Sequence, residues 1–445
     1  MSDGLPQPQR SFAIATLLSA IALAVLDGAI ANVALPTLSS VFSVSPAAAI
    51  WIVTAYQLAL VMALLPLAAL GESLGYRRVF TAGLMLFLAA SAGCALAPSL
   101  GWLALGRFVQ GFGGAAIMAT TAALLRFTYP QRIYGMAIGW NAMVVGLSSA
   151  AGPTIGAGIL SVASWPWLFA VNIPIGLMVL AGTRFLPEAG GTRRRLDVVS
   201  VLLNAGMFGS IVLGVDLLSS RALPALGLIA AGIACLVALV RREMPREAPL
   251  FPLDLLRLRP FRISVIASVS CFSAQMMSYV ALPFYLMHDL GQDAFTTGLA
   301  MTPWPVTVAL CGPLAGRLSN RVPTGVLSAI GGTTLATGLA LAAAWPLAGG
   351  SILPLVPFLV LSGAGFGLFQ TPNNRNMMLT APRERAGAAG GMQSTARLAG
   401  QTIGALVMAV MFTVLADEIA PRVGLALAAV LALTAGVIST LRIAR

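Results

Sequence analysis

The stretch "AVLDGAIANVALP" (24–36) places an aspartate, Asp27, inside an apolar run that begins at Ser11. A charged side chain at the centre of a membrane-spanning helix costs roughly 2.5–3.5 kcal/mol on insertion scales. Such a carboxylate is tolerated where it faces a polar interior, has a partner or binds a proton. Whether this run spans a membrane depends on the composition of the whole chain.

The composition is that of a polytopic membrane protein. Hydrophobic residues make up 58% of the 445 residues, charged residues only 9%, and the mean hydropathy is +0.91. In a soluble domain about a quarter of the residues are charged. Fourteen apolar runs, each near the length that a tilted span needs, cover residues 11–35, 47–70, 78–98, 102–125, 133–161, 165–186, 198–218, 222–240, 261–287, 295–318, 323–346, 351–372, 386–415 and 421–441. The sequence therefore predicts an all-α polytopic membrane protein with fourteen transmembrane helices.

The arginines predict the orientation of these helices. The chain has no lysine, and with both termini in the cytoplasm 22 of its 26 arginines fall in cytoplasmic segments. Two, Arg221 and Arg422, lie outside, and two, Arg107 and Arg397, lie within apolar runs. A positive excess in short loops marks the cytoplasmic side. We therefore expect a multi-pass protein of a bacterial inner membrane with cytoplasmic termini, whose net charge of +12 does not indicate nucleic-acid binding.

An internal similarity suggests two related halves. The loops "AALGESLGYRR" (68–78) and "GRLSNRVPTG" (316–325) share one pattern, in which a small residue, a leucine and an acid or amide stand at every second position. The residues are Ala68, Leu70 and Glu72 in the first loop and Gly316, Leu318 and Asn320 in the second. Two related halves with a binding site between them are a recurrent transporter plan. The predicted organisation is a six-helix bundle over residues 1–190, two additional transmembrane helices over 191–245, and a pseudo-symmetric six-helix bundle over 246–445.

The fourth run, "LALGRFVQGFGGAA" (103–116), contains an arginine inside the predicted membrane. Arg107, Gln110 and two glycines share one helix face, because they are spaced three, four and seven residues apart. One interpretation is that Arg107 holds two helices together through backbone carbonyls. The other is a fixed positive charge that lowers or gates the proton affinity of a nearby carboxylate. Asp27 is the only acid well inside the first six runs.

The fifth run, "GLSSAAGPTIGAGIL" (146–160), carries small residues at every fourth position. Such a stripe lets two helices approach closely, and Pro153 removes one backbone hydrogen bond. We interpret the stripe first as a tight, kinked helix crossing. Since a kinked crossing can set how a bundle rocks, we assign Gly152, Pro153 and Gly156 to the conformational change.

Seven segments together resemble the signatures of the major facilitator superfamily, specifically of its fourteen-span drug:proton antiporters. They are "LDGAIANVALP" (26–36), "GESLGYRR" (71–78), "LALGRFVQGFGGAA" (103–116), "SSAAGPTIGA" (148–157), "WPWLFAVNIPIG" (165–176), "GAGFGLFQTPNN" (363–374) and "GAAGGMQSTARLAGQTIG" (387–404). The resemblance implies that Asp27 carries the coupling proton and that Arg107 tunes it. It also implies that loop residues control opening and closing: Glu72, Gly75, Arg77, Arg78 and Arg321.

The chain departs from this family's pattern at several positions. The first loop has Glu72 followed by Ser73, where the family has an aspartate and an arginine, so a lock between the halves would be weaker or would use Arg77 or Arg78. The second loop has Asn320 in place of an acid. The tenth run lacks the acid that helps some members with divalent cations, so we expect divalent cations to be handled less well.

The predicted substrate site combines polar, methionine and aromatic side chains, because methionine and aromatic residues repack around varied ligands. We assign to it Asn32, Gln57, Gln275, Met276, Tyr279, Trp304, Phe369 and Arg397. Arg397 could also pair with an acid across the bundle. Asp216, near the outer end of the seventh run, is expected to reach the lipid headgroups.

The sequence thus predicts a proton-coupled antiporter that exports lipophilic, cationic drugs or toxic compounds by alternating access. An organic cation would compete with the proton for the Asp27 carboxylate, which gives the cationic character. The alternative is a proton-coupled exporter of one specific metabolite. An enzyme is disfavoured because the single histidine leaves no catalytic cluster, and a sensor because no long soluble segment exists. We expect a monomer in the lipid bilayer that needs no cofactor and no metal.

Overall fold

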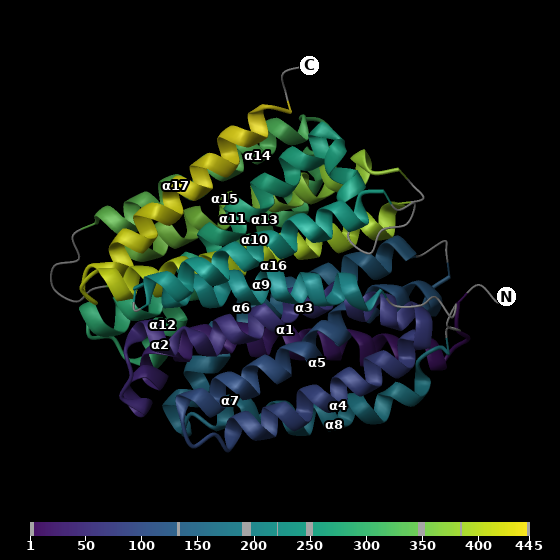
Figure 1. Ribbon diagram of the computed structural model, residues 1–445, viewed down its shortest axis with the longest axis horizontal. Coiled ribbons are helices and arrows are strands. Elements are labelled where there is room, and N and C mark those ends of the chain that lie inside the picture. The colour runs from purple at the N-terminus through teal and green to yellow at the C-terminus, as the bar shows by residue number, and fades with distance from the viewer. Residues whose placement is uncertain are drawn as a thin grey trace.

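The computed structural model describes residues 4–130, 134–188, 197–219, 221–245, 252–345, 352–382 and 385–442. These residues form helices and connecting turns, and no strand occurs among them (Figure 1). In these described ranges, fourteen helical segments are long and apolar enough to cross a membrane, which confirms the predicted number. An even number of crossings puts both chain ends on the same side.

The fourteen spans correspond to one or two helices each. In the N-terminal part these are α1 (Gln9–Phe42), α2 (Pro46–Ala49) with α3 (Trp51–Leu74), α4 (Tyr76–Ala95), α5 (Leu100–Thr128), α6 (Tyr134–Val162) and α7 (Trp167–Ala170) with α8 (Asn172–Gly182). The next two are α9 (Val198–Asp216) and α10 (Ala222–Glu243). The last six are α11 (Arg259–Phe284), α12 (Ala294–Met301) with α13 (Pro303–Leu318), α14 (Thr324–Ala344), α15 (Leu355–Thr380), α16 (Ala386–Val414) and α17 (Ala420–Thr440).

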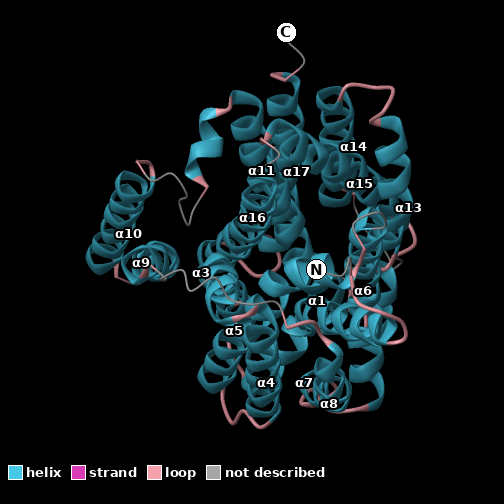
Figure 2. Ribbon diagram, turned by 90° about the vertical axis from the view of Figure 1, so that its right-hand side faces the viewer, coloured by secondary structure: helices cyan, strands magenta, loops and turns pink. Residues whose placement is uncertain are grey.

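The helices gather into two groups and a separate pair. In the first group α3 and α4 pack on α5, and α1 packs on α6. In the second, α14 packs on α15 and α17, and α11 packs on α16 and α17. Figure 1 shows the first group in purple and blue below the second in green and yellow. The pair α9–α10 stands to one side (Figure 2).

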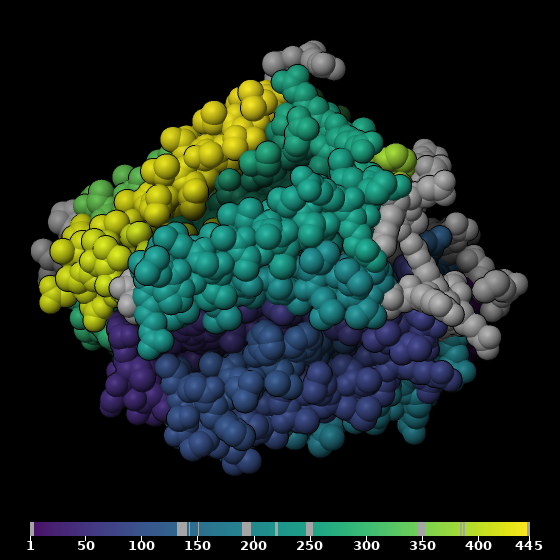
Figure 3. Space-filling view, viewed as in Figure 1, coloured from purple at the N-terminus to yellow at the C-terminus, as the bar shows by residue number. Residues whose placement is uncertain are grey.

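The separate pair is attached through polar contacts of α9. The indole Nε1 of Trp51 donates a hydrogen bond of 2.8 Å to Asp216 Oδ1, and the buried Asn204 donates one of 2.8 Å to the carbonyl of Met62. Both contacts are with α3, and α9 also touches α16 of the other group. The pair therefore covers part of the junction between the two groups (Figure 3). Asp216 anchors α9 to α3, which differs from the predicted role at the headgroups.

The small-residue stripe of α6 packs against α1. A Cβ at Gly152 would lie 2.3 Å from the Cβ of Ala29, and one at Gly156 would lie 3.3 Å from the side chain and carbonyl of Ile30. Side chains at these positions would push the helices apart. The predicted tight crossing is therefore present, with Pro153 inside the helix.

The same helix also joins the two groups. A Cβ at Gly298 of α12 would lie 2.4 Å from the Cβ of Ala157 in α6. The hydroxyls of Thr154 and Thr302 form a hydrogen bond across this contact. The carbonyl of Pro153 would be 2.6 Å from the same Cβ at Gly298. The α6–α12 contact is thus a close backbone approach between the first and second groups.

Candidate functional site

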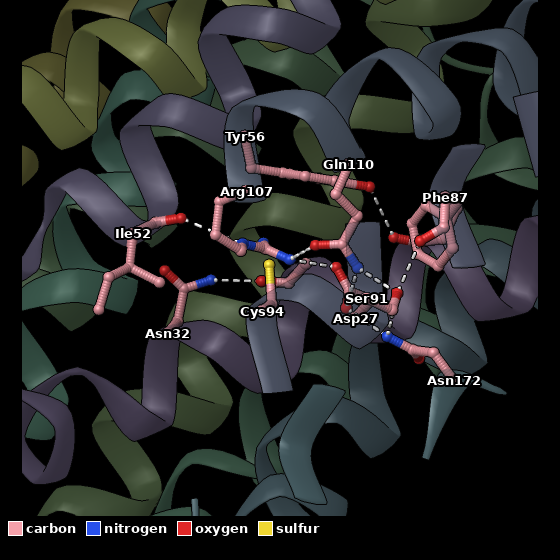
Figure 4. A network of polar contacts seen from close by, with 12 residues as sticks. Asp27, Asn32, Ile52, Tyr56, Phe87, Ser91, Cys94, Arg107, Gln110 and Asn172 are labelled. Atoms are coloured by element: carbon pink, nitrogen blue, oxygen red, sulfur yellow. Dashed lines mark hydrogen bonds and ion pairs between the residues drawn. The ribbon is translucent and has the colours of Figure 1, made fainter. Parts of the chain in front are cut away.

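A buried ion pair lies within the first group of helices. The Nη1 of Arg107, on α5, is 2.5 Å from Oδ2 of Asp27, on α1 (Figure 4). The exposed fraction of the residue is 2% for Asp27 and 0% for Arg107. The arginine and the carboxylate predicted to act together are therefore in direct contact. The pair also explains how an aspartate is accommodated in the apolar run, because each charge neutralises the other.

The second carboxylate oxygen of Asp27 is held by two amide groups. Oδ1 accepts a hydrogen bond of 2.9 Å from Gln110 Nε2 and one of 2.7 Å from Asn172 Nδ2. The hydroxyl oxygen of Ser91 accepts from Gln110 Nε2 at 2.8 Å, while Ser91 itself donates to the carbonyl of Phe87. All of these contacts to Asp27 are donors, and donors stabilise the charged form of a carboxylate.

The guanidinium of Arg107 has further partners besides the carboxylate. Its Nε donates to the carbonyl of Ile52 at 3.1 Å, and its Nη1 donates to Gln110 Oε1 at 2.6 Å. The ring of Tyr56 lies 4.2 Å from the guanidinium carbon and that of Phe169 lies 5.6 Å from it. Contacts with aromatic faces stabilise a desolvated guanidinium. Among the described residues, Nη2 is left without a hydrogen-bond partner.

A proton on Asp27 would remove one of the two charges of this ion pair. The Asp27 charge acts electrostatically on Arg107, Tyr56 and Cys94. A proton arriving at Asp27 would break the ion pair and leave Arg107 without its counter-charge. The ion pair joins α1 to α5.

Three residues of this network were not assigned from the sequence: Asn172, Ser91 and Tyr56. Asn172 stands in "FAVNIPIG" (169–176) as the polar residue of an otherwise apolar helix, which is the one signal that could have identified it. Serine and tyrosine are common in membrane helices, so Ser91 and Tyr56 gave no such signal. Gln110 was placed on the face of Arg107, and the structure brings it into the same network.

The predicted gating loop lies between α3 and α4. Gly75 has a φ of 98°, which a residue with a Cβ rarely adopts, so glycine is needed at this turn. Arg77 forms an ion pair of 3.0 Å with Glu188, which follows α8 in the same group of helices. Arg77 therefore does not bridge the two groups here. Glu72, Arg78 and, in the corresponding turn after α13, Arg321 are exposed. Their gating role stays a prediction.

The predicted substrate residues on α11, α13 and α15 are only partly brought together. The ring of Tyr279 lies edge-on to that of Trp304, with 5.4 Å between the ring centroids. Met276 instead packs against α16, where a Cβ at Gly404 would lie 2.9 Å from it. Phe369 is buried in the second group, and its carbonyl lies near the hydroxyl of Ser328.

The remaining predicted substrate residues have unpartnered polar groups. In the described part of the chain, the buried atoms Asn32 Oδ1, Gln57 Oε1 and Trp304 Nε1 have no hydrogen-bond partner. Asn32 uses its amide nitrogen to donate to the carbonyl of Gly28 in its own helix, outside the Asp27 network. Buried polar groups are normally hydrogen-bonded, so atoms without a protein partner are candidates for ligand contacts.

Comparison with known proteins identifies the family. The sequence model of the Major Facilitator Superfamily matches residues 17–405 and, in a second match, residues 263–444. This chain belongs to the major facilitator superfamily. The predicted family is therefore confirmed, and with it a transporter fold of membrane-spanning helices.

Individual members of the superfamily resemble the chain over most of its length. An uncharacterized transporter of Escherichia coli, YebQ, is 46% identical over 99% of this chain and 97% of its own length. The riboflavin transporter RibZ of Clostridioides difficile is 32% identical over 84% of this chain and 82% of its own. The multidrug resistance protein Stp of Mycobacterium tuberculosis is 32% identical over 86% and 72%.

A solved structure supports the same fold. The bacterial homolog of the human lysosomal transporter Spinster, in an inward-facing and unoccupied conformation, matches with a TM-score of 0.71. The match covers 98% of this chain and 97% of that chain at 15% sequence identity. At this identity the likeness shows the superfamily fold alone.

Proposed function

We propose that this superfamily member exports lipophilic organic compounds from the bacterial cytoplasm in exchange for protons, by alternating access of the two groups of helices. Asp27 carries the coupling proton, and Arg107 favours the return of Asp27 to its charged form. The substrate is moved without chemical conversion. The observation that carries the proposal is the ion pair of Asp27 and Arg107, both of which are buried among the helices of the first group. Relatives named as drug-resistance and export proteins support the export direction.

The burial of Asp27 supports its role in coupling. The carboxylate contacts an arginine and two amides, so a proton on Asp27 would replace a charge that these neighbours hold. Its protonation changes the contact between α1 and α5, and α1 also packs on α6, which meets the second group of helices. A proton at Asp27 could therefore bias the equilibrium between two arrangements of the halves.

The alternative is a transporter dedicated to one metabolite. The relative named as a riboflavin transporter, 32% identical to this chain, favours this alternative. The two functions differ in selectivity and not in the coupling site. Export of many unrelated lipophilic compounds would support the first, and export of a single compound would support the second.

We also propose that the protein works as a monomer in the inner membrane, with both termini in the cytoplasm. The support is the distribution of arginines, 22 of which fall on one side in this orientation. A reporter fused after Gly190 should then be cytoplasmic, and one fused after Pro98 should be outside. The reverse result would overturn the orientation without affecting the number of spans.

The coupling proposal can be tested in everted membrane vesicles that carry a respiration-driven pH gradient. Adding a panel of lipophilic compounds should dissipate the gradient in vesicles with the wild-type protein. Asp27→Asn keeps the shape of the side chain but cannot carry the proton, so no dissipation is expected. Asp417→Asn, which changes an exposed acid, is the matched control and should behave as wild type. Equal dissipation by Asp27→Asn and wild type would refute the role of Asp27.

A further inference from the structure

Two arginines lie deep in the membrane-spanning helices, and they differ in their surroundings. Arg107 forms an ion pair and two further hydrogen bonds, and its guanidinium lies against two aromatic rings. Arg397, in the middle part of α16, is partly buried and has none of these in the described part of the chain. The group that acts on it electrostatically is Tyr56, and no described carboxylate does so. The predicted pairing of Arg397 across the bundle with an acid is therefore not found among these residues.

The packing of α16 places Arg397 at the junction of the two groups of helices. The helix meets α11 through its glycines, since a Cβ at Gly400 would lie 2.7 Å from the carbonyl of Val269. The adjacent Leu398 belongs to the core of the first group, on the side where α16 contacts α3. Arg397 thus lies on a helix of the second group close enough to Tyr56 of the first group for its charge to act on that residue. Tyr56 also lies against Arg107, so the two guanidiniums share this neighbour.

Other polar groups near this junction are free to bind a ligand. Gln57, which follows Tyr56 on α3, is buried, and its Oε1 has no partner among the described residues. Asn32 on α1 and Trp304 on α13 each have one such atom as well. These three residues come from both groups of helices. They are candidates for neutral hydrogen bonds to a ligand.

The ionised side chains of Asp27, Arg107 and Arg397 have a net positive charge. Asp27 contributes one negative charge, and Arg107 and Arg397 contribute one positive charge each. A proton on Asp27 makes the sum more positive still. The prediction of a cationic substrate assumed that the Asp27 carboxylate is available to a cation, but in the structure it already accepts hydrogen bonds from three side chains. An organic cation would meet an unbalanced arginine instead of a free carboxylate.

We propose that Arg397 binds an anionic group of the exported compound, so that the substrates are lipophilic organic anions. This inference rests on the proposed function as an exporter and names its class of substrate. A guanidinium offers a planar set of donors that fits a carboxylate or a sulfonate with two parallel hydrogen bonds. A positive charge kept in the membrane without an internal partner is costly, and a bound anion supplies that partner.

The test is a binding measurement with two probes of matched shape and opposite charge. They are 2-naphthalenesulfonate and trimethyl(2-naphthyl)ammonium, and they are titrated by calorimetry into the full-length protein in nanodiscs of neutral lipid. Empty nanodiscs correct for partitioning into lipid. Wild-type protein should bind the sulfonate at least about tenfold more tightly than the ammonium, a difference of 1.4 kcal/mol.

The variants separate a charge effect from a structural one. Arg397→Gln should abolish the preference for the sulfonate, whereas Arg397→Lys should retain a large part of it, because the positive charge remains. Arg317→Gln, which removes an exposed arginine at the end of α13, should leave the preference unchanged. A wild-type preference for the ammonium, or an unchanged sulfonate preference in Arg397→Gln, would overturn the proposal.

The same probes distinguish this inference from the proposed coupling. Asp27→Asn should keep the sulfonate preference, even though it no longer couples transport to protons. If the vesicle experiment fails and the sulfonate preference holds, the proposed coupling is wrong and the anion site stands. If the preference is absent and Asp27→Asn still abolishes coupling, the anion site is wrong and the coupling stands.

Discussion

Replacing Arg107 with methionine removes the charge that pairs with Asp27 while keeping much of the side-chain volume. The carboxylate then keeps only its two amide donors, Gln110 and Asn172, in a buried site. Removing one partner of a buried ion pair costs about 3–5 kcal/mol, because the other charge is left uncompensated. This range also includes the loss of the hydrogen bonds that Arg107 donates to Ile52 and Gln110. We therefore expect Arg107→Met to lower the free energy of unfolding by about 3–5 kcal/mol at neutral pH.

A second substitution tests whether the loss of stability arises from the unpaired, buried carboxylate of Asp27. Adding Asp27→Leu to Arg107→Met removes the uncompensated carboxylate and leaves an apolar pair. Apolar replacements of buried ion pairs are often neutral or stabilising, so the double variant should recover most of the lost stability. The loss in the single variant should also shrink as the pH falls, because the buried carboxyl then becomes neutral.

The assay is unfolding by sodium dodecyl sulfate in mixed micelles, followed by tryptophan fluorescence for wild type, both single variants and the double variant. The coupling energy between the two positions comes from the double-mutant cycle. Additive losses, with the double variant as unstable as the sum of the single variants, would refute the stranded-charge reasoning. Arg107 would then contribute through packing alone.

Three further outcomes follow from particular contacts. Asn172→Ala removes one of the two amide donors to Asp27, so proton-coupled export in everted vesicles should fall below the wild-type rate. Asp216→Asn weakens the hydrogen bond from Trp51 and should cost about 1.5–3 kcal/mol at most, measured as micellar unfolding, with export retained. Gly298→Val puts a side chain into the close contact between α12 and α6, so export should fall sharply in vesicles, whereas an unchanged rate would show that this contact is not required.

The fourteen spans and the Asp27–Arg107 pair could be predicted because charge is scarce in this chain. Long apolar runs separated by arginine-rich loops leave few alternative boundaries, and the structure follows them closely. Two helices continue well past their predicted ends, α1 through Pro36 to Phe42 and α15 through Pro372 to Thr380. With one acid deep in the first six runs and one arginine on a face of small residues, the pairing was the simplest way to accommodate both.

Other contacts depend on tertiary structure and left no signal in the sequence. Asn172 and Ser91 are neutral, and neutral polar residues occur in membrane helices for many reasons, so their place around Asp27 could not be inferred. Arg77 was expected to help lock the halves, but it pairs with Glu188, which the fold brings beside it. Asp216 was expected at the headgroups because its partner, Trp51, is far away in the sequence.

The direct test of the account is proton uptake or release by purified protein on substrate binding, measured for wild type beside Asp27→Asn. The substrate is whichever of the two naphthalene probes the wild-type protein binds, added at saturating concentration in weakly buffered solution. If Asp27 carries the coupling proton, the wild-type protein takes up protons when the sulfonate binds, or releases them if the ammonium is the probe that binds, and Asp27→Asn does neither. Equal proton exchange by both proteins would contradict the account and place the coupling proton elsewhere, with Glu72 and Asp216 as the next residues to test.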